Sequence, residues 1–217
     1  LALNYNPSAN FDDGSCCYSP TGCVCTQSYQ DTTYLGGFTI DDINSSPSMA
    51  IDVIVAPNEN FTLNTFKPNI MVHTYDTITD ITMRIYSNNS GLPGTLLYME
   101  TFFEYQLNPT YLYSKWQFYN IYRLNLDLTN PYTMLGQLGS DSTYWISLSS
   151  ATTVFGDNSY WGSNHDGPEL GYGSAQWDSY WGSWYNTADE YGYNSSECNY
   201  IFEGVCSAIF SYGCTDS

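Results

Sequence analysis

Apolar and polar residues alternate through the middle of the chain. Ile81, Met83 and Ile85 are separated by single polar residues, and segments 124–128 and 144–148 repeat this period of two. A period of two is typical of β-strands that bury one face. Tyr, Thr, Phe, Ile and Trp are abundant, and these side chains suit a pleated surface. Further strands are predicted over residues 51–55, 61–66, 70–75, 95–103, 116–123 and 200–205.

Turn residues separate the predicted strands, and no long segment has the 3.6-residue period of an amphipathic helix. The clearest turn signal is NNSGLPGT at 88–95, where Pro93 and Gly94 fit the central positions of a type II turn. The sequence therefore predicts an all-β fold, an antiparallel β-sandwich with jelly-roll-like connections over residues 27–210. Residues 1–26 and 211–217 are expected to form a small, disulfide-rich, loop-dominated linker.

Acidic residues far outnumber basic ones. The chain of 217 residues contains 22 Asp and Glu but only 4 Lys and Arg, so its formal net charge is −18 at pH 7. So few cations cannot neutralise phosphate groups, and we expect no nucleic-acid partner. Anionic membranes would repel the chain. No apolar run approaches the roughly 18 residues that a membrane-spanning helix needs, so no membrane insertion is expected.

The seven cysteines gather towards the two ends of the chain. They are Cys16, Cys17, Cys23, Cys25, Cys198, Cys206 and Cys214. This usage predicts disulfides and therefore an oxidising compartment, as expected for a secreted or cell-surface protein. Zinc is the alternative, but Cys23-Val24-Cys25 lacks the usual Cys-x2-Cys spacing, and His73 and His165 lie far away in sequence. Because seven is odd, at least one cysteine stays free or pairs outside the chain.

Two stretches resemble a known β-sandwich domain. They are ITDITMRIYSNNSGLPGTLLY at 78–98 and STYWISLSSA at 142–151. Both are similar to strands of a domain common in large secreted proteins of the Bacteroidota. The resemblance covers roughly residues 35–205, and it implies an extracellular module without catalytic activity.

The two ends of the chain resemble halves of one motif. GCTDS at 213–217, placed before LALNYNPSANFDDGSC at 1–16, resembles the Bacteroidota repeat G-C-T-D-x-x-A-x-N-Y-[ND]-x-x-A-x-x-D-D-G-S-C. The simplest interpretation is one period of a tandem array, while the alternative is separate chains that meet head to tail. Both interpretations predict that copies of this chain are partners, in a filament or a giant surface protein.

The joined motif suggests a calcium site and a disulfide. Its side-chain oxygen donors are Asp216, Asn4, Asn6, Asp12 and Asp13. Oxygen ligands around a glycine turn suit Ca²⁺, although the same residues could simply form turns by bonding to backbone amides. A Cys16–Cys214 bond would close the motif between neighbouring copies. Cys198 and Cys206 are expected to pair locally, which leaves one thiol over among Cys17, Cys23 and Cys25.

Residues 160–194 are rich in aromatic side chains interleaved with glycine. Three uses remain open: a contact between subunits or domains, internal packing over the end of the sandwich, and stacking on sugar rings. A glycan-binding adhesin is therefore the alternative to the structural-repeat function. The candidate interface or glycan residues are Trp161, Trp177, Tyr180, Trp181, Trp184 and Tyr185.

Catalytic signatures are missing from the sequence. It contains no G-x-S-x-G elbow, no H-E-x-x-H motif and no phosphate loop, so we expect a protein that is not an enzyme. Three triplets resemble the D-[ST]-x O-glycosylation signal of the Bacteroidota. Their candidate acceptors are Thr32, Thr77 and Ser142.

Overall fold

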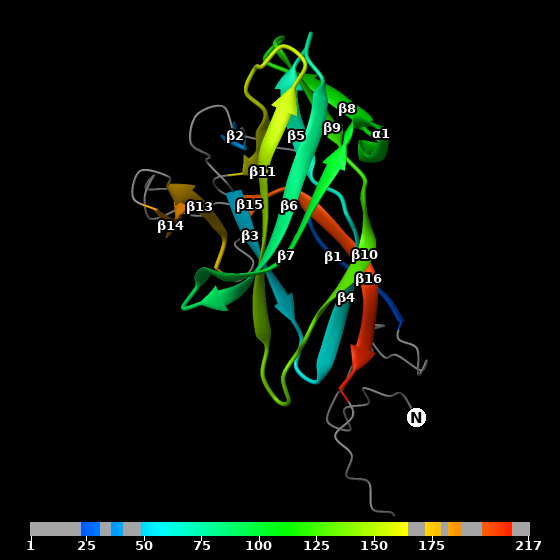
Figure 1. Ribbon diagram of the computed structural model, residues 1–217, viewed down its shortest axis with the longest axis vertical. Helices are drawn as coiled ribbons and strands as arrows, with labels where there is room; N and C mark the ends of the chain where they lie inside the picture. Colours follow the sequence, from blue (N-terminus) through cyan, green and yellow to red (C-terminus); the bar gives the residue numbers. More distant parts are fainter. Residues whose placement is uncertain are drawn as a thin grey trace, which may run out of the picture.

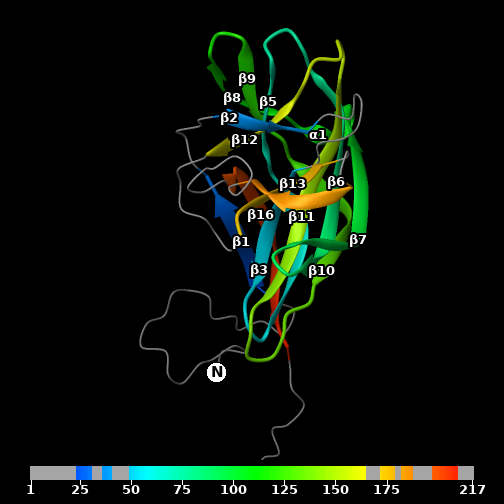
Figure 2. The ribbon, with the colours of Figure 1, turned by 90° about the vertical axis from the view of Figure 1, so that its left-hand side faces the viewer.

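The computed structural model describes residues 23–30, 36–40, 49–164, 172–178, 182–187 and 197–209. Within these ranges the chain is almost entirely β-strand, and its antiparallel sheets pack face to face in two layers (Figure 1, Figure 2). The predicted all-β sandwich is confirmed.

The first layer is one sheet, called sheet 1 here. Its strands, in order across the sheet, are β14 (Ser183–Asn186), β13 (Ser174–Asp178), β3 (Met49–Val55), β11 (Ser142–Thr153), β6 (Ile78–Asn89) and β7 (Leu92–Phe103). The predicted period of two decides which face is buried. Ile81, Met83 and Ile85 of β6 are fully buried between the layers, whereas the alternate residues Arg84 and Tyr86 lie half-buried on the outer face.

The second layer consists of two sheets. Sheet 2 contains β1 (Cys23–Tyr29), β16 (Tyr200–Ala208), β4 (Glu59–Phe66) and β10 (Leu126–Met134). Sheet 3 contains β15 (Glu197–Cys198), β12 (Tyr160–Asn164), β5 (Asn69–His73), β9 (Tyr119–Arg123) and β8 (Thr110–Lys115), with β2 (Gly36–Thr39) also paired to β12.

Sheets 2 and 3 join into one long layer, because the chain passes from one to the other between β4 and β5, between β9 and β10, and between β15 and β16. Backbone hydrogen bonds continue across the joints. The Lys67 amide donates to the Ile201 carbonyl at 2.8 Å, and the Leu124 amide donates to the Pro68 carbonyl at 3.0 Å. One hydrophobic core lies between this layer and sheet 1.

Large aromatic side chains fill part of this core. Trp161 of β12, Phe66 of β4 and Phe202 of β16 are fully buried. The Phe66 ring contacts both others, with centroids 5.6 Å from Trp161 and 5.0 Å from Phe202. The indole N–H of Trp161 donates to the Asn199 carbonyl at 2.9 Å, which satisfies the polar edge of the buried ring.

A short helix, α1 (Glu104–Leu107), carries the chain from β7 towards β8. Leu107 anchors it in the core, and Asn108 ends it in the left-handed region with φ 40°. None of the helices in the described ranges is long and apolar enough to cross a membrane.

The hairpin between β6 and β7 turns at Ser90 and Gly91, whose φ values of 54° and 85° are both positive. Two-residue hairpin turns favour positive φ at both positions, because this geometry matches the twist of the strands. Asn88 supports the turn, since its Oδ1 accepts a hydrogen bond from the Gly91 amide at 3.1 Å. Pro93 and Gly94 lie inside β7, so the predicted type II turn at these residues is wrong.

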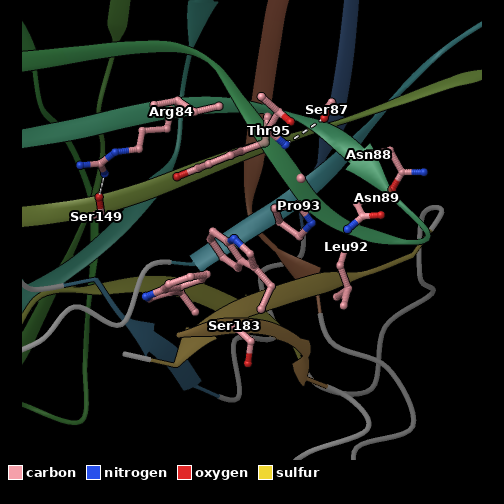
Figure 3. Close-up of a pocket in the computed structure, with 14 residues that line it drawn as sticks. Arg84, Ser87, Asn88, Asn89, Leu92, Pro93, Thr95, Ser149 and Ser183 are labelled. Atoms are coloured by element: carbon pink, nitrogen blue, oxygen red, sulfur yellow. Dashed lines mark hydrogen bonds between the residues drawn. The ribbon is translucent and has the colours of Figure 1, made fainter. Parts of the chain in front are cut away.

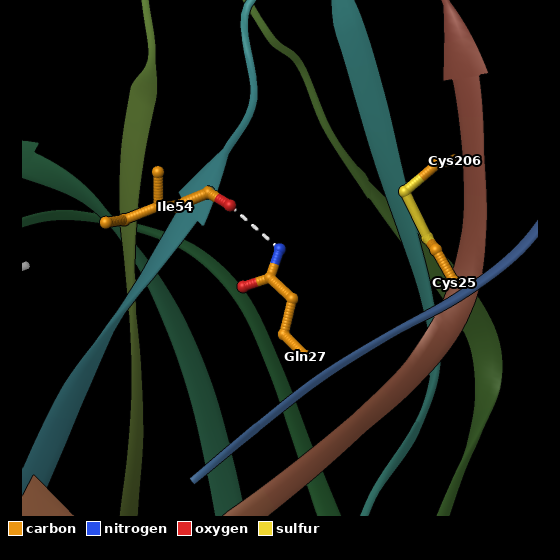
Figure 4. The surroundings of a disulfide bond; sticks show 4 residues. All are labelled: Cys25, Gln27, Ile54 and Cys206. Carbon is orange, nitrogen blue, oxygen red and sulfur yellow. Dashed lines mark hydrogen bonds between the residues drawn. A yellow bond between two sulfur atoms is a disulfide. The ribbon is translucent and has the colours of Figure 1, made fainter. Parts of the chain in front are cut away.

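Strand β1 pairs with β16 along its whole length. A disulfide joins Cys25 of β1 to Cys206 of β16, with the two Cα atoms 5.8 Å apart, and it closes a sequence separation of 181 residues (Figure 4). The Gln27 side-chain amide donates to the Ile54 carbonyl of β3 at 2.8 Å, so β1 is also held to sheet 1 (Figure 4). Strand β1 includes residues 23–26, which the sequence analysis assigns to the linker.

The predicted local bond between Cys198 and Cys206 is wrong. Cys198 of β15 is a free, fully buried thiol, and burial raises its pKa well above the ordinary value. Cys206 follows eight residues later along β16. An extended chain covers about 26 Å in eight residues, whereas the Cα atoms of a disulfide lie only about 4–7 Å apart.

Candidate functional site

A groove of about 900 Å³ lies on the outer face of sheet 1 (Figure 3). Its floor comes from β6 and β11, and one wall comes from the start of β7. The opposite wall comes from the β13–β14 hairpin, which extends sheet 1 beyond β3 and contacts β7 through β14. The groove lies between the β6–β7 hairpin and the β13–β14 hairpin because the sheet curls.

Aromatic rings from both hairpins meet in the groove. The Trp184 ring contacts Tyr86 and Trp177 edge to face, with centroid distances of 5.6 Å in each case. All three side chains are half-buried, so each keeps part of its surface open to the groove. The Tyr86 hydroxyl is protonated at physiological pH, as a tyrosine ordinarily is, and burial raises its pKa further.

Polar groups stand beside these rings at the tip of β6. The Asn88 Oδ1 accepts hydrogen bonds from the Gly91 amide and from the indole N–H of the fully buried Trp145, both at 3.1 Å. No described residue accepts a hydrogen bond from the Asn88 amide nitrogen. Because two bonds fix the orientation of this exposed side chain, it can present that nitrogen as a donor to a ligand.

One cation lines the groove. Arg84 lies on the outer face of β6, and its Nη1 donates to the Ser149 hydroxyl of β11 (Figure 3). Figure 3 places this pair towards one end of the groove, away from Asn89 and Leu92 at the hairpin tip.

A smaller cavity of about 470 Å³ continues from the groove on the far side of Leu92 and Trp184. Tyr172 and Tyr185 line it, and the Tyr185 hydroxyl donates to the Gln176 side chain at 2.8 Å. The two cavities together make an extended surface that a chain-like ligand could follow.

The structure separates the aromatic candidates of residues 160–194. Trp177, Trp184 and Tyr185 line the two cavities. Trp161 is fully buried between the layers, so its assignment to an interface or glycan site is wrong. Its role is internal packing, which was one of the three uses considered. Tyr180 and Trp181 lie outside the described residues.

Most of the terminal candidates also lie outside the described residues. They are Asn4, Asn6, Asp12, Asp13, Cys16, Cys17, Thr32, Cys214 and Asp216. Within the described ranges, no group of three His, Cys, Asp or Glu side chains could hold a metal ion. The calcium site and the Cys16–Cys214 bond therefore stay predictions.

The two remaining O-glycosylation candidates differ in exposure. Thr77 is exposed in the connection between β5 and β6, where a modifying enzyme could reach its hydroxyl. Ser142 is only 8% exposed at the start of β11. Modification of Ser142 would therefore have to precede folding.

A second group of aromatic side chains, the apical cluster, belongs to the β5–β6 connection, the β8–β9 connection and the segment after β11, and Figure 2 shows the hairpin of β8 and β9 at the end of the molecule away from the lower end of β16. Tyr75, Trp116, Phe118 and Phe155 are all more than half exposed, at 59%, 52%, 60% and 69%. The His73 ring contacts Tyr75, with centroids 4.5 Å apart. These rings do not line the groove or its continuation.

Sequence reasoning missed Arg84, Tyr86 and Asn88 as site residues. One signal for them was present: they are alternate residues of β6, offset by one from the buried Ile81, Met83 and Ile85, so they share the outer face. The sequence could not indicate that the β13–β14 hairpin, which lies far away along the chain, folds against this face.

Comparison with protein-family models, with curated proteins and with solved structures finds no match for this chain.

Proposed function

We propose that this chain is a carbohydrate-binding domain of an extracellular adhesin. The observation behind the proposal is that Tyr86 of one hairpin and Trp177 and Trp184 of another meet beside fixed amide and hydroxyl groups in one groove. Aromatic faces with a few oriented polar groups suit small polar ligands with one apolar face, as sugar rings have. The groove volume lies in the upper part of the range of about 300–1,000 Å³ for ligand sites.

An extracellular location is consistent with the Cys25–Cys206 disulfide, since such bonds persist in oxidising compartments. The acidic composition supports solubility at a cell surface. Together with the resemblance of residues 78–98 and 142–151 to secreted Bacteroidota domains, these features support an adhesin rather than an intracellular binding protein.

The test is glycan binding by the purified domain and by Trp184→Ala. We expect the wild type to bind at least one member of a glycan array. Trp184→Ala should weaken that interaction by roughly five- to hundredfold, if the ring contributes on the order of the 1–3 kcal/mol that a nucleobase gains by stacking on an aromatic side chain.

Trp116→Ala is the matched control, because it removes an exposed tryptophan of the apical cluster. It should leave the affinity unchanged. Loss of binding in Trp116→Ala but not in Trp184→Ala would move the site to the apical cluster and refute the groove.

We also propose a second function, the structural repeat of a surface filament or giant surface protein, which the Cys25–Cys206 bond favours. The bond joins the first and last described strands, and Cys23 is the register partner of Cys206. The two ends of the sandwich domain therefore lie side by side. Tension applied at these ends would pass through the disulfide and bypass the core.

The array proposal is tested on the native cell surface with an antibody against this domain. Immunoblots of surface extracts should show species far larger than the 24.5 kDa of this chain. A tandem array would keep its size in reductant, whereas disulfide-linked separate chains would collapse to monomers. A single band near 24.5 kDa under both conditions would contradict both arrangements.

A further inference from the structure

The four cationic side chains of the protein differ in their surroundings. Three of them are engaged by groups that have no part in the groove. Lys67 pairs with Glu203 at 2.6 Å, Arg123 donates to Asn69 and Gln30, and Lys115 lies 4.7 Å from the ring centroid of Trp116. The fourth, Arg84, lines the groove.

Arg84 keeps most of its hydrogen-bonding capacity unused. A guanidinium carries five N–H donors, and within the described ranges the Ser149 hydroxyl is the one hydrogen-bond acceptor of this side chain. No described carboxylate lies within ion-pair distance of it. The half-buried guanidinium is thus held in place by one bond while its other donors stay available to a ligand.

The groove also lacks the acidic residues that dominate the rest of the chain. The protein contains 22 Asp and Glu, yet none of them is among the described residues that line the groove or its continuation. Among the described residues that line the two cavities, Arg84 is therefore the one charged side chain, although the net charge of the protein is −18. A neutral sugar would not need a cation in the groove, because its hydroxyl groups accept hydrogen bonds from side-chain amides as well as from a guanidinium.

Resting on the carbohydrate-binding function proposed above, we propose that the groove binds an acidic saccharide. Its sugar ring lies against Trp184 and Tyr86, and its carboxylate accepts hydrogen bonds from Arg84. The planar guanidinium fork matches a carboxylate in two parallel hydrogen bonds. The ligand carries isolated carboxylates, as uronic or sialic acids do, since a densely charged polyanion would be repelled by the protein as a whole.

The experiment measures dissociation constants for matched ligand pairs. The probes are sialyllactose and short uronic-acid oligosaccharides, each compared with a twin whose carboxylates are chemically reduced to hydroxymethyl groups. Twins share every linkage and ring, so the difference in affinity reports the carboxylate alone. We expect at least one acidic member to bind at least about tenfold more tightly than its twin, as a charge-assisted hydrogen bond provides.

Three variants assign that difference to a residue. Arg84→Gln should lower the affinity for the acidic saccharide to that of the neutral twin and leave the twin unaffected. Arg84→Lys should retain part of the difference, because it keeps the charge but loses the fork. Lys115→Gln changes the net charge equally but lies in β8 of sheet 3, so it should change nothing. Unchanged melting temperatures will confirm that the variants are folded.

The outcomes separate the two proposals. If acidic and neutral twins bind equally and Trp184→Ala abolishes both, carbohydrate binding holds and the acidic preference is overturned. Equal loss of acidic-saccharide affinity in Arg84→Gln and Lys115→Gln would also overturn it, because the effect would then be one of net charge. If no acidic or neutral member binds the wild type, the carbohydrate-binding function itself fails.

Discussion

At the scale of single residues, Asp76 shows how a carboxylate can organise loops. It is 5% exposed in the connection between β5 and β6. Its Oδ1 accepts hydrogen bonds from the backbone amides of Thr77 at 2.7 Å and Phe155 at 3.1 Å, and its Oδ2 accepts one from Asp157 at 3.3 Å. The side chain therefore ties this connection to the one that follows β11, beneath part of the apical cluster.

The Asp76 pKa gives a pH-dependent prediction. Burial alone would raise this pKa, but hydrogen bonds from the Thr153 side chain and the three amides outweigh it and lower the pKa below the ordinary 3.8. The depressed pKa means that the ionised form stabilises the fold above about pH 4, and that this contribution is lost as the pH falls through the lower folded-state value.

We therefore expect Asp76→Asn to lower the free energy of unfolding by about 1–2 kcal/mol at neutral pH, since hydrogen bonds to a charged acceptor are the stronger ones. Urea unfolding, followed by tryptophan fluorescence, measures the change. The difference from wild type should shrink as the pH falls below about 4 and through the lowered folded-state pKa, because the ionised carboxylate is lost from the wild type there. If wild type and Asp76→Asn differ in stability by the same amount at every pH, the ionised Asp76 carboxylate is not what stabilises the fold.

At the scale of elements, one covalent bond reinforces the pairing of β1 with β16. β1 is an edge strand of sheet 2. Its seven residues pair with β16, its Tyr29 packs in the core, and its Gln27 side chain bonds to sheet 1. A disulfide that closes 181 residues restricts the unfolded chain strongly. The chain-entropy model puts the upper limit near 5 kcal/mol for a loop of this length.

Replacing Cys25 and Cys206 together by serine should lower the free energy of unfolding by roughly 3–5 kcal/mol. Both must be replaced, because Cys23 is the register partner of Cys206 and could pair with it if Cys25 alone were removed. Equilibrium denaturation with and without dithiothreitol provides the control: reductant should destabilise the wild type and leave the double variant unchanged. If wild type and the double variant are equally stable without dithiothreitol, the Cys25–Cys206 bond does not contribute to stability.

At the scale of the whole molecule, the period of two predicted the layers well. Ile81, Met83 and Ile85 lie in the core as expected, because one buried face is enough to fix a strand's orientation. The same rule failed for β11, where Trp145 and Ser147 are also fully buried although they lie on the other face. The Trp145 ring packs under the β13–β14 hairpin in a small cluster that is separate from the main core.

The groove could be predicted only in part for the same reason. The aromatic content of residues 160–194 indicated a binding or packing role, and Trp177 and Trp184 do line the groove. Their partners on β6 could not be inferred, because the curl of a sheet and the pairing of β13 with β3 depend on contacts between segments far apart in sequence. Local patterns do not encode such contacts.

The pairing of β1 with β16 also orders the events of folding. β1 precedes every other described strand in the sequence, and β16, its partner in the described sheet, is the last. During synthesis, β1 must therefore wait unpaired until the whole domain has emerged. Contacts of such long sequence separation form slowly, because the entropy of closing the loop opposes them. Oxidation of Cys25 and Cys206 is then expected to be the final step of maturation. Reduced thiols at these two positions would therefore mark molecules that have not finished folding.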